Sequence, residues 1–388
     1  MNFFHHLKYS FYSLFSIFVQ IPANMIVEFL GKKNSLILAN VLNCIYLVII
    51  MLSRNLIDLI FAEFISSIAF AIKNIVEPSL LNESIPPSKY KGKIYSKINA
   101  KGTSGYYLLN AISKIIAGYL FTINSYLPVI CSLVVSVIVV ILSLCFIEPI
   151  KRNKKNINDL FNKKELKNLK EGFVYIFKSE RLKALILISS MIAALLTVLS
   201  SYTVSLFEDL NFSSVIIGII AAIISLISAY ASKLQERFHK RFRNKSLITI
   251  AMMISISCII YGVCGLKAEE YKVLLIFIFI ATIMYGFGEG MYSTLIDKYL
   301  RNFANEQIDT KIFSAKHLFR NVTKVVMGFF ASFLLDKMKT AYCMIIVGTV
   351  FVILYLLIGK YMKKRVGLRP EQYSKEETKY DEWKDDFA

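Results

Sequence analysis

Long stretches without any charged residue decide what this chain can fold into. Three of the clearest cover residues 127–147, 184–206 and 246–266. Each is about as long as the roughly 20 residues that a helix needs to cross a bilayer core of about 30 Å. Hydrophobic residues make up 56% of the 388 residues, whereas soluble domains contain about 45–50%. No soluble core needs so many such runs, so the sequence predicts a polytopic membrane protein.

The apolar runs predict an all-α fold with about eleven transmembrane helices. The predicted spans are residues 9–29, 35–53, 56–80, 104–123, 127–147, 183–206, 213–232, 246–265, 272–296, 317–336 and 341–361. Internal repeats in the sequence divide the eleven spans into two related helical bundles.

The positive charge of the chain follows the order of these spans. The net charge is +19, which in a soluble protein would suggest nucleic acid as a partner. Here most lysines and arginines fall in alternate loops, which is the pattern of cytoplasmic loops in membrane proteins. Lys337 and Lys339 are the exception. The charge distribution predicts a cytoplasmic C-terminus, an external N-terminus and no nucleic-acid partner.

Motifs for enzymatic chemistry are missing from the sequence. The six cysteines lie inside apolar runs and form no C-x-x-C pair, so they read as small core residues. No G-x-x-x-x-G-K-[ST], H-E-x-x-H or G-x-S-x-G motif occurs. We therefore expect no cofactor, no metal site and no enzymatic activity.

Three weak internal repeats divide the chain into halves. They occur in the same order in both halves, at offsets of about 210–218 residues. The paired segments are 32–37 with 243–248, 92–96 with 310–314, and 113–118 with 323–328. Repeats joined by a long cytoplasmic loop are typical of secondary transporters. The predicted organisation is an N-terminal bundle over 1–149, a linker over 150–182, a C-terminal bundle over 183–361 and a cytoplasmic tail over 362–388.

The linker contains an amphipathic stretch. Apolar residues lie on one helical face and lysines cover much of the rest, which favours a helix on the inner membrane surface. The apolar residues are Leu166, Leu169, Phe173, Ile176 and Phe177.

Several segments resemble the major facilitator superfamily of transporters. Residues 24–33 stand where the family carries G-x-x-x-D-R-x-G-R-K between its second and third helices, although Asn24 replaces the first glycine and Phe29 the arginine. Residues 146–149 are similar to the F-x-E-P that closes the sixth helix. Residues 77–84 are similar to D-E-A-x-x-Y-D-S, and residues 367–373 also look like bacterial members.

The resemblance implies a function. Members of this family carry small solutes across the bilayer by rocking two bundles around a midplane site. By this analogy we expect a monomeric transporter in the plasma membrane of a bacterium, with proton-coupled efflux as the preferred direction. In this alignment residues 9–29 correspond to the family's second helix, so the family's first helix has no counterpart in these residues.

The same resemblance defines a candidate gating loop. Gly31 permits a tight turn, and Lys32 and Lys33 hold the loop on the inner side. Glu28 keeps the family's carboxylate, which can face the N-terminus of a nearby helix.

Ionisable residues inside the spans are the candidate pathway residues, because each costs about 2.5–3.5 kcal/mol at mid-bilayer. Lys73 and Glu289 occupy corresponding places in the third and ninth spans. They either form a pair, bind a charged solute, or reach water at the cytoplasmic end. Glycines 286, 288 and 290 flank Glu289, so the backbone there bends or is closely approached.

Lys114 and Lys324 are counterparts in the fourth and tenth spans. Lys114 lies too deep to reach water, so we expect it to face the interior, with Glu28, Glu77 and Glu289 as candidate partners. Lys324 shares a helical face with His317 and Arg320, and access to cytoplasmic water is the simpler explanation for that stripe.

Glu63 in the third span is a candidate proton carrier. A carboxyl hydrogen-bonded to a neighbouring helix is the favoured alternative. The hydroxyl residues at 200–205 either line the pathway or pack helices.

Two other functions stay open. A relative of transporters that has lost transport, kept as a receptor or scaffold, is the first alternative. A membrane-embedded enzyme is the second, and it would need clustered polar residues that the sequence lacks. The expected partners are therefore the lipid bilayer, a small-molecule solute and protons.

Overall fold

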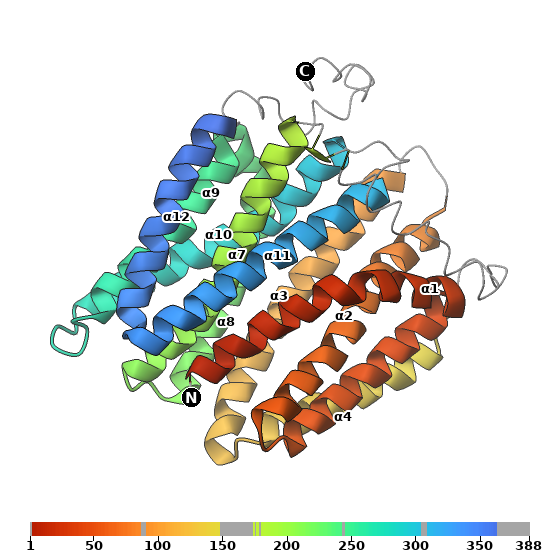
Figure 1. Cartoon of the computed structure of the whole chain (residues 1–388), viewed down its shortest axis with the longest axis horizontal. Coiled ribbons are helices and arrows are strands. Elements are labelled where there is room, and N and C mark those ends of the chain that lie inside the picture. Colours follow the sequence, from red (N-terminus) through yellow and green to blue (C-terminus); the bar gives the residue numbers. More distant parts are fainter. Residues whose placement is uncertain are drawn as a thin grey trace. The chain divides into compact units, whose positions relative to one another are not determined.

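A computed structural model describes residues 2–86, 91–147, 174, 176–177, 180–242, 245–303 and 309–362. All regular secondary structure in these ranges is helical (Figure 1). The helices are α1 (Asn2–Leu52), α2 (Leu56–Ser84), α3 (Lys91–Ile123), α4 (Leu127–Leu144), α7 (Glu180–Asp209), α8 (Ser214–Phe242), α9 (Ser246–Gly265), α10 (Leu274–Phe303), α11 (Asp309–Lys337) and α12 (Thr340–Met362).

The all-α polytopic fold predicted from the sequence is confirmed. Within the described ranges, 10 helical segments are long and apolar enough to cross a membrane. The first two predicted spans, 9–29 and 35–53, both lie in α1, which is interrupted at Gly31. The sequence-based division and the observed helices therefore agree once α1 is read as two helical segments.

Local sequence signals fix several helix starts. Asn55 caps α2, because its side-chain oxygen accepts a 2.9 Å hydrogen bond from the backbone N–H of Asp58. A proline in the first turn of α4 suits a position whose N–H has no helical partner. The polar turn at 53–55 thus separates α1 from α2 without a long loop.

The chain forms two compact units. The first contains residues 1–6, 104–118 and 168–388, and the second contains residues 7–103 and 119–167. The predicted linker (150–182) and tail (362–388) fall almost entirely outside the described residues, including Leu166, Leu169 and Phe173. The domain limits placed there stay predictions.

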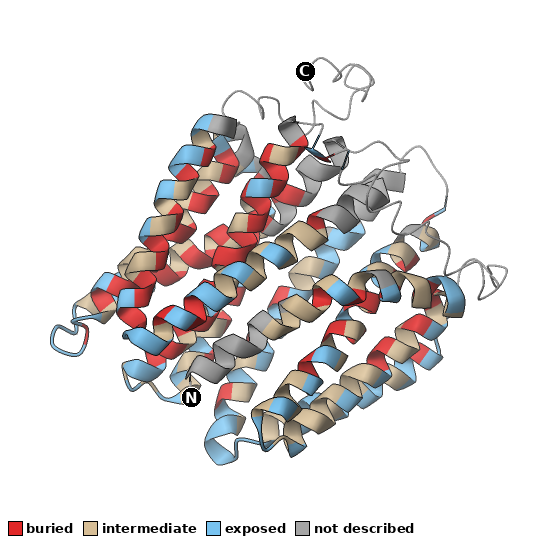
Figure 2. Cartoon of the chain, viewed as in Figure 1, coloured by how far each residue is buried: buried red, intermediate tan, exposed pale blue. Residues whose placement is uncertain are grey.

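The first unit has the larger buried core, centred on α7, α9 and α12. Its fully buried large side chains include Tyr202, Tyr261 and Phe351, and Figure 2 shows the dense burial along α7. Tyrosine hydroxyls bridge helices within it: Tyr202 donates to the Ala331 carbonyl at 2.8 Å and Tyr261 to Thr282 at 2.8 Å. Such interhelical hydrogen bonds support packing where lipid offers no hydrophobic driving force.

The second unit has a smaller core formed by α1 and α2. Its most buried members are small or β-branched, such as Ala23, Ala39 and Ile72. Asn43 of α1 donates a 3.0 Å hydrogen bond to Ser136 of α4, which links the fourth helix to this unit.

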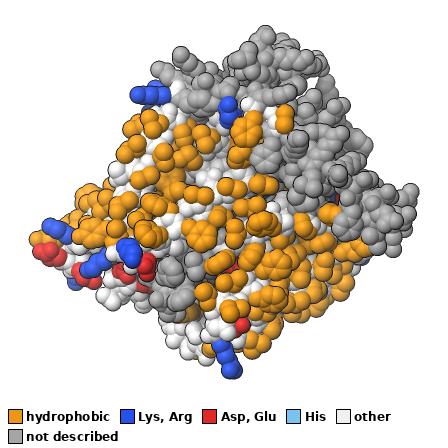
Figure 3. All heavy atoms as spheres, in the orientation of Figure 1, with side chains coloured by type: hydrophobic (Ala, Val, Ile, Leu, Met, Phe, Trp, Pro, Cys, Tyr) orange, Lys and Arg blue, Asp and Glu red, His pale blue; other side chains and the backbone are white. Residues whose placement is uncertain are grey.

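Hydrophobic side chains cover most of the described surface seen in Figure 3. Charged side chains are few on that face and lie near its edges. An apolar face of this extent would aggregate in water, whereas a bilayer covers it.

Candidate functional site

The C-terminal third of α3 places a lysine in the first unit. The Lys114 ammonium donates hydrogen bonds to Ser225 Oγ at 2.9 Å and to the Ala221 carbonyl at 3.4 Å, both on α8. Ser225 is buried and donates in turn to the Ala221 carbonyl at 3.1 Å. Two oxygens of α8 therefore accept hydrogen bonds from the lysine ammonium.

A carboxyl group lies close to this lysine. Glu289 of α10 and Lys114 are near enough for their charges to act on each other. Oε2 of Glu289 lies 3.1 Å from the hydroxyl of the fully buried Ser228. Lys114, Ser225, Ser228 and Glu289 form what we call the polar network of the first unit.

Glycines let the helices of this network approach closely. A Cβ on Gly118 would lie 2.7 Å from the Ser214 carbonyl oxygen, and one on Gly218 would lie 2.6 Å from the Lys114 carbonyl oxygen. Both distances are shorter than van der Waals contact, so α3 and α8 cross at a point where only glycine fits. Lys114 lies one turn before Gly118 on α3, and the crossing brings its ammonium to Ala221 and Ser225 of α8.

The glycines beside Glu289 serve the same purpose. A Cβ on Gly290 would lie 2.2 Å from the Ser228 carbonyl oxygen, and one on Gly286 would lie 3.0 Å from the Ile224 carbonyl oxygen. Of the two roles that the sequence suggested for these glycines, a bend or close approach, the observed contacts are close approaches. These glycines allow α10 to pack closely against α8, which brings the Glu289 carboxyl to Ser228.

Three other predicted pathway residues lie on α2 in the second unit. Lys73 is half-buried and its charge acts on Glu77, one turn further along the same helix. Glu63 is buried. Lys73 and Glu289 belong to different units, so a pairing between them stays a prediction.

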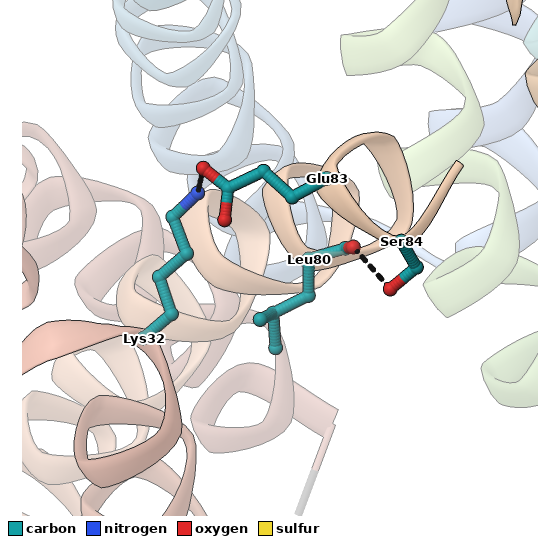
Figure 4. Close-up of polar contacts among 4 residues, drawn as sticks. All are labelled: Lys32, Leu80, Glu83 and Ser84. Carbon is teal, nitrogen blue, oxygen red and sulfur yellow. Dashed lines mark hydrogen bonds and ion pairs between the residues drawn. The ribbon is translucent and has the colours of Figure 1, made fainter. Parts of the chain in front are cut away.

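The candidate gating loop forms a sharp break in α1. Gly31 has φ 77°, a left-handed conformation that other residues rarely adopt. The buried Lys32 forms an ion pair with Glu83 near the end of α2 (Figure 4). Lys33 is half-buried and Glu28 is exposed. The ion pair thus ties the break in α1 to the C-terminal end of α2.

Sequence reasoning named Glu289 among the candidate partners of Lys114, but it missed Glu83 and the serines that contact the charged residues. Glu83 lies in the segment 77–84 that resembles the family, and that position was the available signal. Ser225 and Ser228 had no such signal, because serine is common in membrane helices as a packing residue. Lys324 and its stripe on α11 are also half-buried in the first unit.

A family model described as Major Facilitator Superfamily matches residues 6–307. The chain belongs to the major facilitator superfamily. No curated protein matched the sequence.

Solved structures share the superfamily fold at low identity. A POT family transporter in complex with a thioalcohol-conjugated peptide has a TM-score of 0.72 at 14% identity, with 94% of this chain and 88% of that chain covered. The nucleoside transporter NupG has a TM-score of 0.66 at 16% identity, with 93% and 91% covered. The inward-open xylose transporter XylE from E. coli has a TM-score of 0.65 at 14% identity, with 93% and 86% covered. At these identities the likeness shows the transporter fold.

Proposed function

We propose that this superfamily member is a secondary active transporter that exports a small solute by alternating access, driven by protons entering the cell. The observation that carries the proposal is the polar network of Lys114, Ser225, Ser228 and Glu289. Ionisable groups inside a membrane protein are costly and typically mark substrate or proton pathways. A scaffold has no evident need for a lysine and a glutamate at the glycine-lined crossing of three helices.

The hydrogen-bond geometry around Glu289 supports a proton-binding role. Ser228 Oγ lies 2.9 Å from the Ile224 carbonyl oxygen, 3.0 Å from the Gly286 carbonyl oxygen and 3.1 Å from Glu289 Oε2. A hydroxyl has one hydrogen to donate. A protonated Glu289 can donate to Ser228, whose own hydrogen then goes to a carbonyl. An ionised Glu289 instead accepts from Ser228 and is balanced by Lys114.

The network therefore offers partners for both protonation states of the carboxyl. Protonation removes the attraction between Glu289 and Lys114, which helps to hold α3 against α8 and α10. The Lys114 ammonium still donates to the Ser225 and Ala221 oxygens after Glu289 is protonated. Protonation therefore weakens the contact of α3 with α8 and α10 while the ammonium keeps its hydrogen-bond acceptors. We propose that this weakening couples proton binding to the change of access. Glu63, Lys73 and Glu77 on α2 remain candidate residues of the solute pathway in the second unit.

The orientation proposed here rests on the loop charges, and the cellular setting and oligomeric state rest on the family resemblance. We propose a monomer in the plasma membrane of a bacterium, with its C-terminus in the cytoplasm. The break at Gly31 and the ion pair of Lys32 with Glu83 would then lie at the cytoplasmic side. We propose that the break and the ion pair stabilise the state in which the cytoplasmic gate is closed.

Transport can be tested without knowing the solute. The full chain would be reconstituted into liposomes loaded with a mixture of amphipathic solutes, and an inward proton gradient would be imposed. Mass spectrometry of the external medium should show at least one solute leaving faster than from liposomes without protein, and Glu289→Gln should abolish the acceleration by the gradient. Equal loss from both kinds of liposome would favour the alternative of a non-transporting receptor or scaffold.

A further inference from the structure

Three basic side chains, of which Arg320 and Lys324 carry the charge, form a stripe on α11. His317, Arg320 and Lys324 are spaced three and four residues apart, which places them on one face of the helix. None of the three is exposed. We call this set the cationic stripe.

The cationic stripe faces the interior of the first unit. The exposed side chains of α11 lie on the opposite face and include Val326 and Phe333, with 61% and 60% of their surfaces accessible. Ala331 and Leu334 continue the face of the stripe and are buried in the core of the first unit. The cations therefore point away from the apolar surface that a bilayer would cover.

The described residues supply no anion to the stripe. Nη2 of Arg320 lies 3.1 Å from Nδ1 of His317. Arginine only donates, so Nδ1 accepts and the ring hydrogen sits on Nε2. Nε of Arg320 is buried and has no hydrogen-bond partner in the described part. Lys324 has no hydrogen bond or ion pair to any described residue, and the charge that acts on it is the like charge of Arg320.

The neighbouring helices explain this lack. Among the described helices, α11 packs mainly against α7 and also against α12. Residues 182–207 of α7 contain no Asp or Glu, and neither does α12. The acidic residues of α11 itself, Asp309 and Asp336, lie at its ends.

Two unneutralised cations inside a membrane protein call for an anionic partner. Arginine stays charged in proteins, and an unpaired charge in such a setting costs several kcal/mol. The guanidinium fork of Arg320 matches a carboxylate or phosphate, Lys324 adds a point charge, and Nε2–H of His317 adds a neutral donor. We propose that the cationic stripe binds the anionic group of the transported solute, a carboxylate or a phosphate. This inference rests on the proposed transport function.

Depth favours a solute over a lipid headgroup. The candidate span of α11 begins at Lys316. Lys324 follows eight residues later, about 12 Å further along the helix. A headgroup phosphate stays at the interface, and it would have to leave that plane to reach Lys324 on a face that points inward.

Binding of simple anions tests the proposal. The full chain in phosphatidylcholine nanodiscs would be heated with increasing concentrations of benzoate, succinate or phenyl phosphate, with benzyl alcohol as the neutral analogue. A ligand that binds the folded state raises the unfolding temperature in a concentration-dependent way. We expect at least one anion to stabilise the protein and benzyl alcohol to have no effect.

Variants locate the site. Arg320→Gln and Lys324→Gln should each weaken the apparent affinity for that anion roughly tenfold or more, because each removes a charge-assisted hydrogen bond of about 1.5–3 kcal/mol. Lys337→Gln is the matched control, since Lys337 lies on the same helix with 59% of its side chain accessible. Equal weakening by the control, equal stabilisation by benzyl alcohol, or no stabilisation by any of the three anions would overturn the proposal.

A second measurement separates a binding site from a structural charge. If nothing in the protein neutralises Lys324, then Lys324→Met should raise the unfolding temperature without ligand, because it removes an unpaired cation from a half-buried position. A lower unfolding temperature in phosphatidylcholine would mean that Lys324 has a structural partner, and would contradict the proposal.

Three further outcomes separate the lipid from the solute and this inference from transport itself. If stabilisation by the anions disappears when phosphatidylglycerol is added to the nanodiscs, and Lys324→Gln abolishes that competition, a lipid headgroup occupies the stripe and the solute assignment fails. If the liposomes export only uncharged solutes, at the same rate in wild type and Lys324→Gln, transport stands and the anion site fails. If anions bind the stripe and no solute moves, the site stands and the proposed transport fails.

Discussion

At the scale of single residues, sequence and structure agree best on the charged side chains. Lys114 and Glu289 stand out in the sequence because each interrupts an apolar run, where an ionisable group is costly. Their partners, Ser225 and Ser228, do not stand out. Which serine faces a charge depends on how each helix is rotated about its axis, and the apolar pattern of a nearly all-apolar helix hardly constrains that rotation.

The ion pair between Lys32 and Glu83 gives a prediction at this scale. Only 5% of the Lys32 side chain and 14% of the Glu83 side chain are accessible. Lys32→Gln should therefore lower the free energy of unfolding by about 2–3 kcal/mol, since it leaves a partly buried carboxylate without its cation. Thermal unfolding of the detergent-solubilised protein would measure this loss.

The neighbouring residue provides the control. Lys33→Gln removes the same charge from a half-buried position without a described ion pair and should have a much smaller effect. The double exchange Lys32→Glu with Glu83→Lys should recover part of the stability. If the exchange is as unstable as the sum of its two single variants, the pair is not the source of the effect.

At the scale of whole helices, the sequence predicted the spans well and the helix lengths less well. The span predicted over 104–123 lies inside α3, which already begins at Lys91. The span predicted over 272–296 ends seven residues before the end of α10 at Phe303. Hydropathy detects only the part of a helix that lies in the bilayer core. The polar turns beyond it remain helical because their backbone hydrogen bonds continue the same ladder.

The crossing of α3 and α8 gives a prediction at this scale. Gly118→Ala should lower the unfolding temperature by several degrees, because the new methyl group would lie 2.7 Å from the Ser214 carbonyl oxygen. The helices would have to separate, which also lengthens the contacts of Lys114 with α8. Proton-driven export should fall together with stability.

Gly105→Ala is the matched control on the same helix. A Cβ at Gly105 would meet no atom within 4 Å, so the helix should gain slightly from the better helix former. Similar losses in both variants would show that the close crossing is not what makes Gly118 necessary.

At the scale of the whole molecule, the sequence predicted the membrane class and the superfamily, whereas the limits of its two predicted bundles stay predictions. The internal repeats divide the chain near its middle. The structure groups residues 104–118 of α3 with the helices from α7 onward. A short glycine-dependent crossing produces this grouping, and such a contact leaves no periodic signal in the sequence.

Orientation in the membrane is a prediction for the whole chain. Alternate loops rich in lysine and arginine predict a cytoplasmic C-terminus. A green fluorescent protein fused after Ala388 should fluoresce, because it folds in the cytoplasm, and alkaline phosphatase at the same place should be inactive. The reverse result would mean that the C-terminus lies outside the cell, and the turn at Gly31 would then lie on the outer side as well.

The coupling of solute export to proton entry through Glu289 is the central claim of this account. A pH-sensitive dye inside proteoliposomes would report proton entry while the outward movement of the solute is recorded in the same sample. We predict that the two fluxes rise together in wild type and in Glu270→Gln, whose parent carboxylate is exposed in the loop before α10. In Glu289→Gln proton entry should stop while exchange of solute across the membrane continues. Unchanged proton entry in Glu289→Gln, or solute export without any proton entry in wild type, would contradict the account.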